Sequence, residues 1–371
     1  MNIPRFSAAH AFSPAWREAA DECLASLAVP PGSNLGFIYF SDHYADSAET
    51  LLTHLRQSTG VHNWVGSMGI GICGEGIAAI DRPGLSVLLG RFPERSFQVF
   101  SGRQPLGHGG PAQPIGAQFA AHFAVVHADP HTPDMSDLIA DMAGKVSSGF
   151  VTGGLSSART TTRQIANGVL HGGISGVAFS DGIRIATRLT QGCSPLPGRH
   201  RIDECERNII ARIDGKPALD VYRSTAGEVL GRDLQRAAQS ILIGLPVTGR
   251  DTSDYRVRHV IGIDIQKGLL AISEEVRAGD AVLFCQRGGA AAEQDMHRML
   301  NELKSSLETR PQAGLYFSCL GRGHSMFPDD SSELEMIRDA FSGLPTAGFF
   351  CSGEISHDQL YGYTGVLTLF L

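Results

Sequence analysis

The chain has 371 residues, more than one hydrophobic core usually covers, so two domains are expected. Its formal net charge of -7 disfavours a nucleic-acid partner, and no apolar stretch is long enough to cross a membrane. The N-terminal residues lack the apolar core of a signal peptide, so the cytoplasm is the expected compartment.

Four strand–helix–strand units are predicted in chain order, because short apolar runs bounded by glycine alternate with amphipathic segments. In each unit the ranges are given in the order strand, helix, strand. The first three units are 35–40, 46–58 and 63–69; 122–128, 135–146 and 149–154; and 281–286, 290–309 and 313–321. The fourth unit begins with the strand at 313–321 and continues with a helix at 331–343 and a strand at 346–353. This alternation predicts an α/β fold in which helices flank parallel neighbouring strands. Shorter strand-like runs can add antiparallel strands, so we expect mixed, largely parallel sheets; these runs are 85–92, 174–180, 259–265 and 365–371.

Loops and a domain junction are predicted from glycine, proline and turn residues. The loops are 101–118, 190–201 and 246–259. A turn signal, Asp-Gly-Lys-Pro at 214–217, interrupts the strand and helix pattern. The predicted domains are therefore residues 1–218, with a core from about residue 35, and residues 219–371.

The seven cysteines include no CxxC pair, and their number is odd. Several lie in apolar runs, such as "VLFCQ" and "GFFCSG". This usage predicts reduced, buried thiols rather than a disulfide framework or a zinc site.

Glycine-rich segments end several predicted strands, and in their order and spacing they resemble the FIST family (F-box and intracellular signal transduction proteins). The resemblance extends from about Leu35 to the end of the chain and includes both the N-terminal and the C-terminal FIST domains. The segments that carry it are "GFVTGGLSS" (149–157), "VLHGGISGVAFSDG" (169–182), "QGCSPL" (191–196), "IDGKPALDVY" (213–222), "GLYFSCLGRG" (314–323) and "LPTAGFFCSGEIS" (344–356).

The resemblance implies a sensory module that binds a small ligand, such as an amino acid, and acts in signal transduction. No output domain is expected in this chain, so the signal would pass to a separate signalling protein. One feature departs from the family pattern: relatives often place an acid directly after the first glycine motif, whereas here none occurs between Gly66 and Glu75. An adaptor that binds protein and no ligand is an alternative, and a homodimer is left open.

A ligand site is expected where strand ends meet, in a cleft between the two domains. Gly321, Arg322 and Gly323 can form a backbone nest for a carboxylate, and Glu354 can receive an ammonium group. This pair of charges predicts an amino acid or a similar small carboxylate as ligand. The alternative is a buried Arg322–Glu354 ion pair that ties two turns together. The other predicted ligand-binding residues are Ser67, Gly153, Gly154, Gln191, Cys319 and Gly353, although the glycines also fit simple turns.

Two further readings concern catalysis and metal binding. A cysteine enzyme would use Cys319 with His324. The local sequence shows no pair of a general base and a residue that orients it, so catalysis is the alternative and not the main prediction. A haem or metal site would use His127 and His131; ordinary turn or surface histidines are the alternative. No metal or cofactor is therefore expected.

Overall fold

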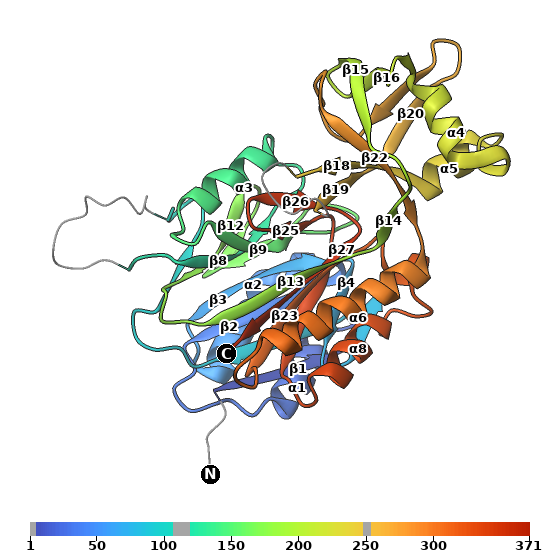
Figure 1. Ribbon diagram of the computed structural model, residues 1–371. Helices are drawn as coiled ribbons and strands as arrows, with labels where there is room; N and C mark the ends of the chain where they lie inside the picture. Colours follow the sequence, from blue (N-terminus) through green and yellow to red (C-terminus); the bar gives the residue numbers. More distant parts are fainter. Residues whose placement is uncertain (1–4, 107–118, 248–253) are drawn as a thin grey trace. The chain divides into compact units, whose positions relative to one another are not determined.

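The computed structural model describes residues 5–106, 119–247 and 254–371, and the chain forms two compact units. The first unit comprises residues 1–190 and 295–371, and the second comprises residues 191–294. The second unit is therefore an insertion in the sequence of the first (Figure 1).

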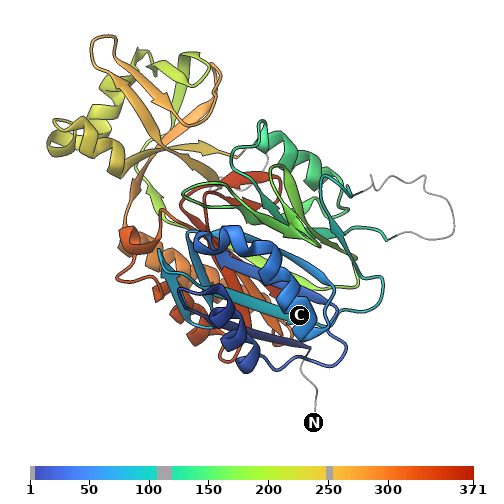
Figure 2. The same ribbon diagram turned by 180° about the vertical axis from the view of Figure 1, so that it is seen from behind.

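The first unit contains three six-stranded sheets with the same strand arrangement (Figures 1 and 2). The first sheet has the order β1 (Phe6–Ala11), β6 (Leu85–Gly90), β2 (Leu35–Ser41), β3 (Asn63–Gly69), β10 (Gln164–Ala166) and β11 (Val169–Leu170). The second sheet has the order β7 (Phe97–Phe100), β12 (Ile174–Phe179), β8 (Phe123–Ala128), β9 (Phe150–Leu155), β25 (Glu354–Ser356) and β26 (Gln359–Tyr361). The third sheet has the order β13 (Ile185–Gln191), β27 (Thr364–Phe370), β23 (Ala313–Cys319), β24 (Thr346–Cys351), β4 (Gly71–Gly74) and β5 (Ile77–Ile80).

Three structural repeats build these sheets, and their strands follow one another in the same order. The repeats are residues 35–90, 123–179 and 313–370. In each repeat a strand leads through a helix to a parallel strand, and an antiparallel strand later returns beside the first. Between the parallel and the returning strand, the chain leaves its own sheet and adds a hairpin to the sheet of another repeat. The exchange is cyclic, because the first repeat gives β4–β5 to the third sheet, the third gives β25–β26 to the second, and the second gives β10–β11 to the first.

Helices cover the outer face of each sheet, and the inner faces of all three share one apolar core. Helices α1 (Trp16–Ser26) and α2 (Ala48–Thr59) cover the first sheet, and α3 (Met135–Gly144) covers the second. Helices α6 (Gly289–Ser306) and α8 (Ser332–Ala340) lie on the third sheet (Figure 1). The short helices η1 (Asp42–Ser47) and α7 (Gly323–Met326) complete the first unit.

Gly66, Gly153 and Gly348 occupy the same position in the three repeats, on the second of the two parallel strands. A Cβ atom on each would lie only 1.7 to 1.8 Å from the carbonyl oxygen of its paired residue on the neighbouring parallel strand. No side chain fits at that distance, so the sequence needs glycine at all three points where the sheets exchange hairpins.

Three rings meet where the inner faces of the sheets converge. Tyr39, His127 and Phe317 hold equivalent positions in the three repeats, and their ring centroids lie 5.6 to 6.2 Å apart. Phe349 contacts all three rings at 5.2 to 6.1 Å. All four side chains are fully buried, so the point where the three equivalent repeats meet is packed core.

The second unit is one antiparallel sheet with two helices. Its main strand order is β19 (Tyr255–Arg258), β18 (Ile241–Pro246), β22 (Ala281–Arg287), β15 (His200–Glu206), β16 (Ile209–Ile213), β21 (Leu269–Ile272) and β20 (Val260–Asp264). The short strands β14 (Cys193–Pro195) and β17 (Lys216–Pro217) pair with β22 and β16, and the helices are α4 (Ala218–Leu230) and α5 (Leu234–Ser240).

The predicted α/β fold with mixed sheets is confirmed, and within the described residues the parallel pairs are the central pair of each repeat. One predicted unit is wrong: the strand at 281–286 lies in the sheet of the second unit, so it does not neighbour the strand at 313–319. The junction predicted at 218 lies inside the second unit, and the division there stays a prediction. Residues 107–118 and 248–253 of two predicted loops lie outside the described residues.

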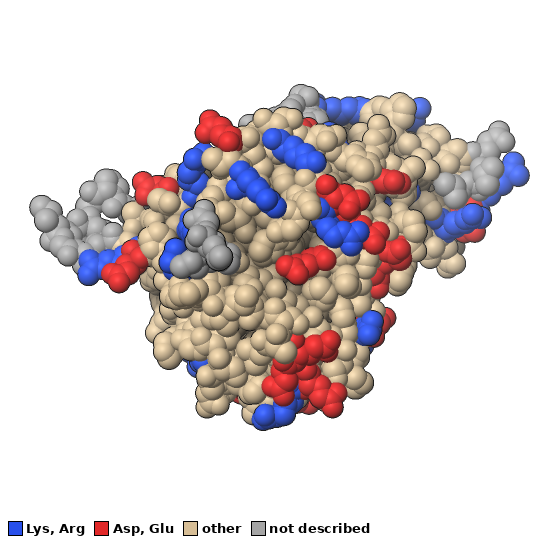
Figure 3. Space-filling view, turned by 90° about the horizontal axis from the view of Figure 1, so that it is seen from below, with Lys and Arg blue, Asp and Glu red and all other residues tan. Residues whose placement is uncertain are grey.

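Charged side chains of both signs are interspersed on the molecular face shown in Figure 3, with wide uncharged areas between them. Among the described residues of that face, no continuous basic surface is visible. The mixed pattern gives no electrostatic preference for a polyanion on this side.

Candidate functional site

Arg322 lies in a buried polar cluster of the third repeat. Its Nε and Nη2 atoms lie 2.8 and 2.7 Å from Oε1 of Glu333 on α8. The other oxygen of Glu333 accepts from Ser318 at 2.7 Å, and Tyr316 donates to Oε1 at 2.6 Å. The guanidinium also lies 5.2 Å from the ring centroid of Phe327.

The cluster fixes Arg322 as an internal cation. Its side chain is fully buried, and its backbone N–H donates to the Cys319 carbonyl at 2.9 Å. Burial acts to lower the pKa of Arg322, but Glu333 raises it above its ordinary value, so the pair is ionic. Arg322 therefore forms a buried ion pair, but with Glu333 on α8 and not with Glu354, the partner considered from the sequence.

Glu354 begins the exchanged strand β25 and is also fully buried. Its Oε2 atom accepts from the backbone N–H and the hydroxyl of Thr364 at 3.2 and 2.8 Å. Its Oε1 atom has no hydrogen-bond partner in the described part of the chain. Burial raises the pKa of Glu354 to about 8, so the carboxyl group is largely neutral at pH 7.

The repeats show what Glu354 does in the fold. Gln164 and Ile72 hold the equivalent positions on the other exchanged strands, as the strand pairing shows. Gln164 donates at 3.2 Å to the carbonyl of Gly173, just before the returning strand of its repeat, much as Glu354 binds the start of its own. A side-chain hydrogen bond from the exchanged strand to the start of the returning strand is therefore common to the second and third repeats, whereas the first repeat has the apolar Ile72 at this position.

Cys319 and His324 do not form a catalytic pair. Cys319 ends β23 as a partly exposed residue, but its thiol group is buried, and this burial raises its pKa far above the ordinary value. The His324 side chain is 69% exposed and lies 3.1 Å from Asp330. The Glu354 carboxyl group lies beside the Cys319 thiol and raises its pKa further, and a thiol that stays protonated has little nucleophilic character.

The other predicted residues lie at different points of the fold. The Ser67 hydroxyl lies 2.7 Å from that of Ser156. Gly154 pairs with Glu354 and leaves room for the sulfur of Cys351, so the second and third glycine motifs meet. The remaining placements are Gly153 beside Ile355, Gly353 against Leu360, Gly321 against Tyr363, Gly323 against Ile80, and Gln191, which donates to the Tyr255 carbonyl within the second unit.

The histidines do not converge. His127 lies in the buried centre with its Nε2 atom 3.2 Å from the Tyr39 hydroxyl, and burial lowers its pKa to about 3. The His131 side chain is 76% exposed beside Asp129, and His122 bonds Ser147. The described residues contain no cluster of three or more metal-binding side chains.

The structure also shows a pocket that sequence patterns did not reveal. It has a volume of about 220 Å³ and lies between the β4–β5 turn and the end of α8. Glu75 and Arg338 line it together with the apolar side chains of Leu334, Ile337 and Leu344. Its components lie about 260 residues apart in the sequence, and the hairpin exchange brings them together.

Arg56 in the first repeat is the equivalent of Arg338 in the third. The two arginines have different hydrogen-bond partners. Each arginine lies ten residues before the equivalent glycine of its repeat. Arg56 donates to the main-chain carbonyls of Asn167 and His62 at 2.9 and 3.2 Å. Among the described residues, Arg338 has only long ion-pair contacts of 3.7 and 3.8 Å to two side chains of its own helix. Its guanidinium is therefore available to a ligand.

Comparison with known families identifies two domains that together cover most of the chain. The FIST N domain matches residues 34–216, and the FIST C domain matches residues 218–357. The chain belongs to the FIST family. FIST domains are sensory domains associated with signal transduction. In this FIST chain, Ile72 holds the position in the first repeat that Glu354 holds in the third.

Curated relatives include two uncharacterised mycobacterial proteins. One, from Mycobacterium tuberculosis (strain CDC 1551 / Oshkosh), is 29% identical over 211 residues. The other, from Mycobacterium bovis (strain ATCC BAA-935 / AF2122/97), is 28% identical over 257 residues. The matched regions span 55% and 66%, respectively, of both this chain and the relative. None of the helices within the described residues is both long and apolar enough to cross a bilayer.

Proposed function

We propose that this FIST chain is a sensory protein that binds an amino acid or a similar small carboxylate in the Glu75–Arg338 pocket. The observation that carries the proposal is the available guanidinium of Arg338, which faces the same pocket as a carboxylate and an apolar wall. Arg338 would bind the ligand carboxylate, Glu75 its ammonium group, and the apolar wall its side chain.

The size and the electrostatics of the pocket support a ligand of this kind. A volume of about 220 Å³ is below the roughly 300–1,000 Å³ of sites for drug-sized ligands. Partial burial raises the pKa of Glu75 above its ordinary value because the carboxylate is partly desolvated, and a ligand ammonium group would stabilise its charged form. Leu334 and Ile337 are almost completely buried, so they form a packed apolar floor under the pocket and expose little surface themselves.

Ligand binding would connect two repeats. Glu75 and Gly76 form the turn of a hairpin from the first repeat, whereas Arg338 belongs to the third. A ligand held by both would favour arrangements in which this hairpin stays docked against α8, and a separate signalling protein would respond to that difference. The sequence also predicted a ligand site that uses Arg322 and Glu354 in a cleft between the two domains, and that site stays a prediction.

The test is calorimetric titration of the purified chain with leucine and with its deaminated analogue 4-methylpentanoate. We expect Arg338→Ala to weaken both by at least tenfold and Glu75→Gln to weaken leucine more than the analogue. The matched control is Arg184→Ala, because Arg184 has only a long, exposed contact to Glu308 at 3.6 Å. Equal affinity of the wild type and Arg338→Ala for both compounds, or no binding to the wild type, would contradict the proposal.

A further inference from the structure

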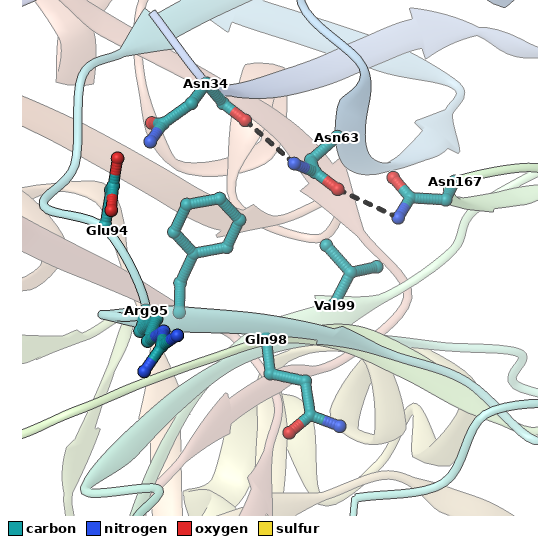
Figure 4. Close-up of a pocket in the computed structure, with 8 residues that line it drawn as sticks. Asn34, Asn63, Glu94, Arg95, Gln98, Val99 and Asn167 are labelled. Carbon is teal, nitrogen blue, oxygen red and sulfur yellow. Dashed lines mark hydrogen bonds between the residues drawn. The ribbon is translucent and has the colours of Figure 1, made fainter. Parts of the chain in front are cut away.

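A second cavity, of about 540 Å³, lies elsewhere on the first unit (Figure 4). It shares no lining residue with the Glu75–Arg338 pocket. Its lining combines side-chain amides, one acid, one guanidinium and two apolar side chains: Asn34, Asn63, Glu94, Arg95, Phe97, Gln98, Val99 and Asn167.

Three asparagines form one wall, and hydrogen bonds fix their orientation (Figure 4). The Asn63 amide donates to the Asn34 carbonyl at 3.1 Å, and its oxygen accepts from the Asn167 amide at 3.2 Å. The Asn167 oxygen accepts from the backbone of Trp64 at 2.9 Å. A primary amide has two N–H donors, so Asn63 and Asn167 each keep one for a ligand in a fixed direction.

The opposite wall is the loop before β7 and the strand itself. Glu94 and Val99 lie toward the asparagines, whereas Arg95 and Gln98 point the other way (Figure 4). Among the described residues, Glu94 makes no hydrogen bond or ion pair, so both of its oxygens are available to accept. Phe97 is half-buried against Phe92 and Phe179, at centroid distances of 5.8 and 6.4 Å.

From this arrangement we propose a second ligand site, for a neutral polyhydroxylated molecule such as a monosaccharide or disaccharide. Sugar hydroxyls both donate and accept, which matches a carboxylate acceptor opposite two amide donors. The C–H face of a sugar ring can cover Val99 and the exposed part of Phe97. The cavity volume is within the usual range for a ligand of that size.

Other ligand classes match this cavity less well. Glu94 is its only acid, and the described lining contains no histidine or cysteine, so a metal ion lacks a ligand set. An anion would meet the Glu94 carboxylate while the neighbouring guanidinium points away (Figure 4). A neutral ligand rich in hydroxyl groups uses the amides and the acid without burying an unpaired charge.

The experiment is saturation-transfer NMR of the full chain with glucose, galactose, sucrose and trehalose, with calorimetry for any sugar that responds. We expect Glu94→Ala to weaken the bound sugar by at least tenfold. Glu308→Ala is the matched control, because it removes an exposed carboxylate of the first unit that does not line this pocket. Asn167→Gly is a second variant: glycine suits the positive φ of 55° at this turn and removes the amide.

The expected result is binding of at least one sugar, weakened by Glu94→Ala and Asn167→Gly and unchanged by Glu308→Ala. No response to any of the four sugars at millimolar concentration would overturn the proposal. So would a sugar that binds Glu94→Ala as tightly as the wild type. Melting temperatures of all variants, measured without sugar, separate a lost contact from a lost fold.

Discussion

At the scale of single residues, the most strongly constrained contact is that between Arg322 and Glu333. Both side chains are almost completely buried, and the same Glu333 carboxylate also accepts from Tyr316 and Ser318. Removing one partner leaves a buried charge without compensation. We expect Arg322→Met to destabilise the fold by about 3–5 kcal/mol in urea denaturation.

The double variant Arg322→Met with Glu333→Leu is the control for that interpretation. It removes both charges, so we expect it to recover part of the stability lost in the single variant. The exposed pair of Arg184 and Glu308 should contribute less than about 1 kcal/mol in the same assay. A single variant as stable as the wild type would show that the buried ion pair is not needed.

The raised pKa of Glu354 predicts how the stability of the fold changes with pH. Its pKa is about 8 in the folded chain and near 4.5 when unfolded, so the folded state holds a proton that unfolding releases. Between about pH 4.5 and pH 8 the stability contributed by this group should therefore fall as the pH rises. Glu354→Gln cannot titrate, and its amide oxygen can still accept from Thr364. We expect this variant to lose that part of the slope.

The measurement is the free energy of unfolding of the wild type and Glu354→Gln across this range. Subtracting one free-energy profile from the other separates the contribution of Glu354 from that of His127. The lowered pKa of His127 makes stability rise with pH below about pH 6.5, which is the opposite direction. Parallel profiles of the wild type and Glu354→Gln would exclude a raised pKa at this position.

Sequence patterns singled out Arg322 and Glu354 because a charge beside a glycine turn in an apolar run is unusual. They could not identify Glu333 as the partner of Arg322, since that depends on how α8 packs on β23. The Glu75–Arg338 pocket was missed for the same reason. Its acid and its arginine each look like ordinary surface residues until the hairpin of one repeat is placed in the sheet of another.

At the scale of elements, the three equivalent glycines control the exchange of hairpins. An alanine methyl group at Gly153 would overlap the Val126 carbonyl oxygen at 1.8 Å, so β8 and β9 would have to separate. We expect Gly153→Ala to cost at least about 3 kcal/mol and to lower the melting temperature sharply. Gly168→Ala is the control, because no atom lies within 4 Å of a Cβ placed there.

Gly66→Ala and Gly348→Ala should behave like Gly153→Ala, since their Cβ atoms meet the equivalent carbonyls at 1.7 and 1.8 Å. If all three variants melted at the wild-type temperature, the close approach of the parallel strands would not be required. Apolar runs between glycines located the parallel strands correctly. The exchange could not be predicted, because a strand that continues in its own sheet and one that crosses to another have the same apolar pattern.

At the scale of the whole molecule, the chain is three equivalent repeats with one inserted unit. The family resemblance divides the sequence into an N-terminal and a C-terminal domain, whereas the packing joins residues 1–190 with 295–371. Local patterns could not reveal this, because membership of a core depends on contacts between distant segments. The strand at 281–286 shows the difficulty: it has the same apolar pattern as the core strands but belongs to the inserted unit.

The ends of the inserted unit predict that it can be removed. The Thr190 hydroxyl donates to the Asp295 carboxylate at 3.0 Å, so the two residues that flank the insertion are in direct contact within the first unit. Arg298 also bonds the Leu189 carbonyl at 3.4 Å. A short Gly-Ser linker in place of residues 191–294 would span this gap with little loop-closure cost. Asp295 would then begin α6, and aspartate is a favoured residue at a helix start.

We expect this deletion variant to fold, because the three sheets and their shared core lie outside the deleted segment. Circular dichroism and thermal unfolding would show one cooperative transition, and the Glu75–Arg338 pocket, which lies wholly in the retained part, would keep its ligand affinity. An insoluble or molten deletion variant would show that the insertion is needed to fold the repeats. A folded variant with unchanged binding would assign ligand recognition to the three repeats.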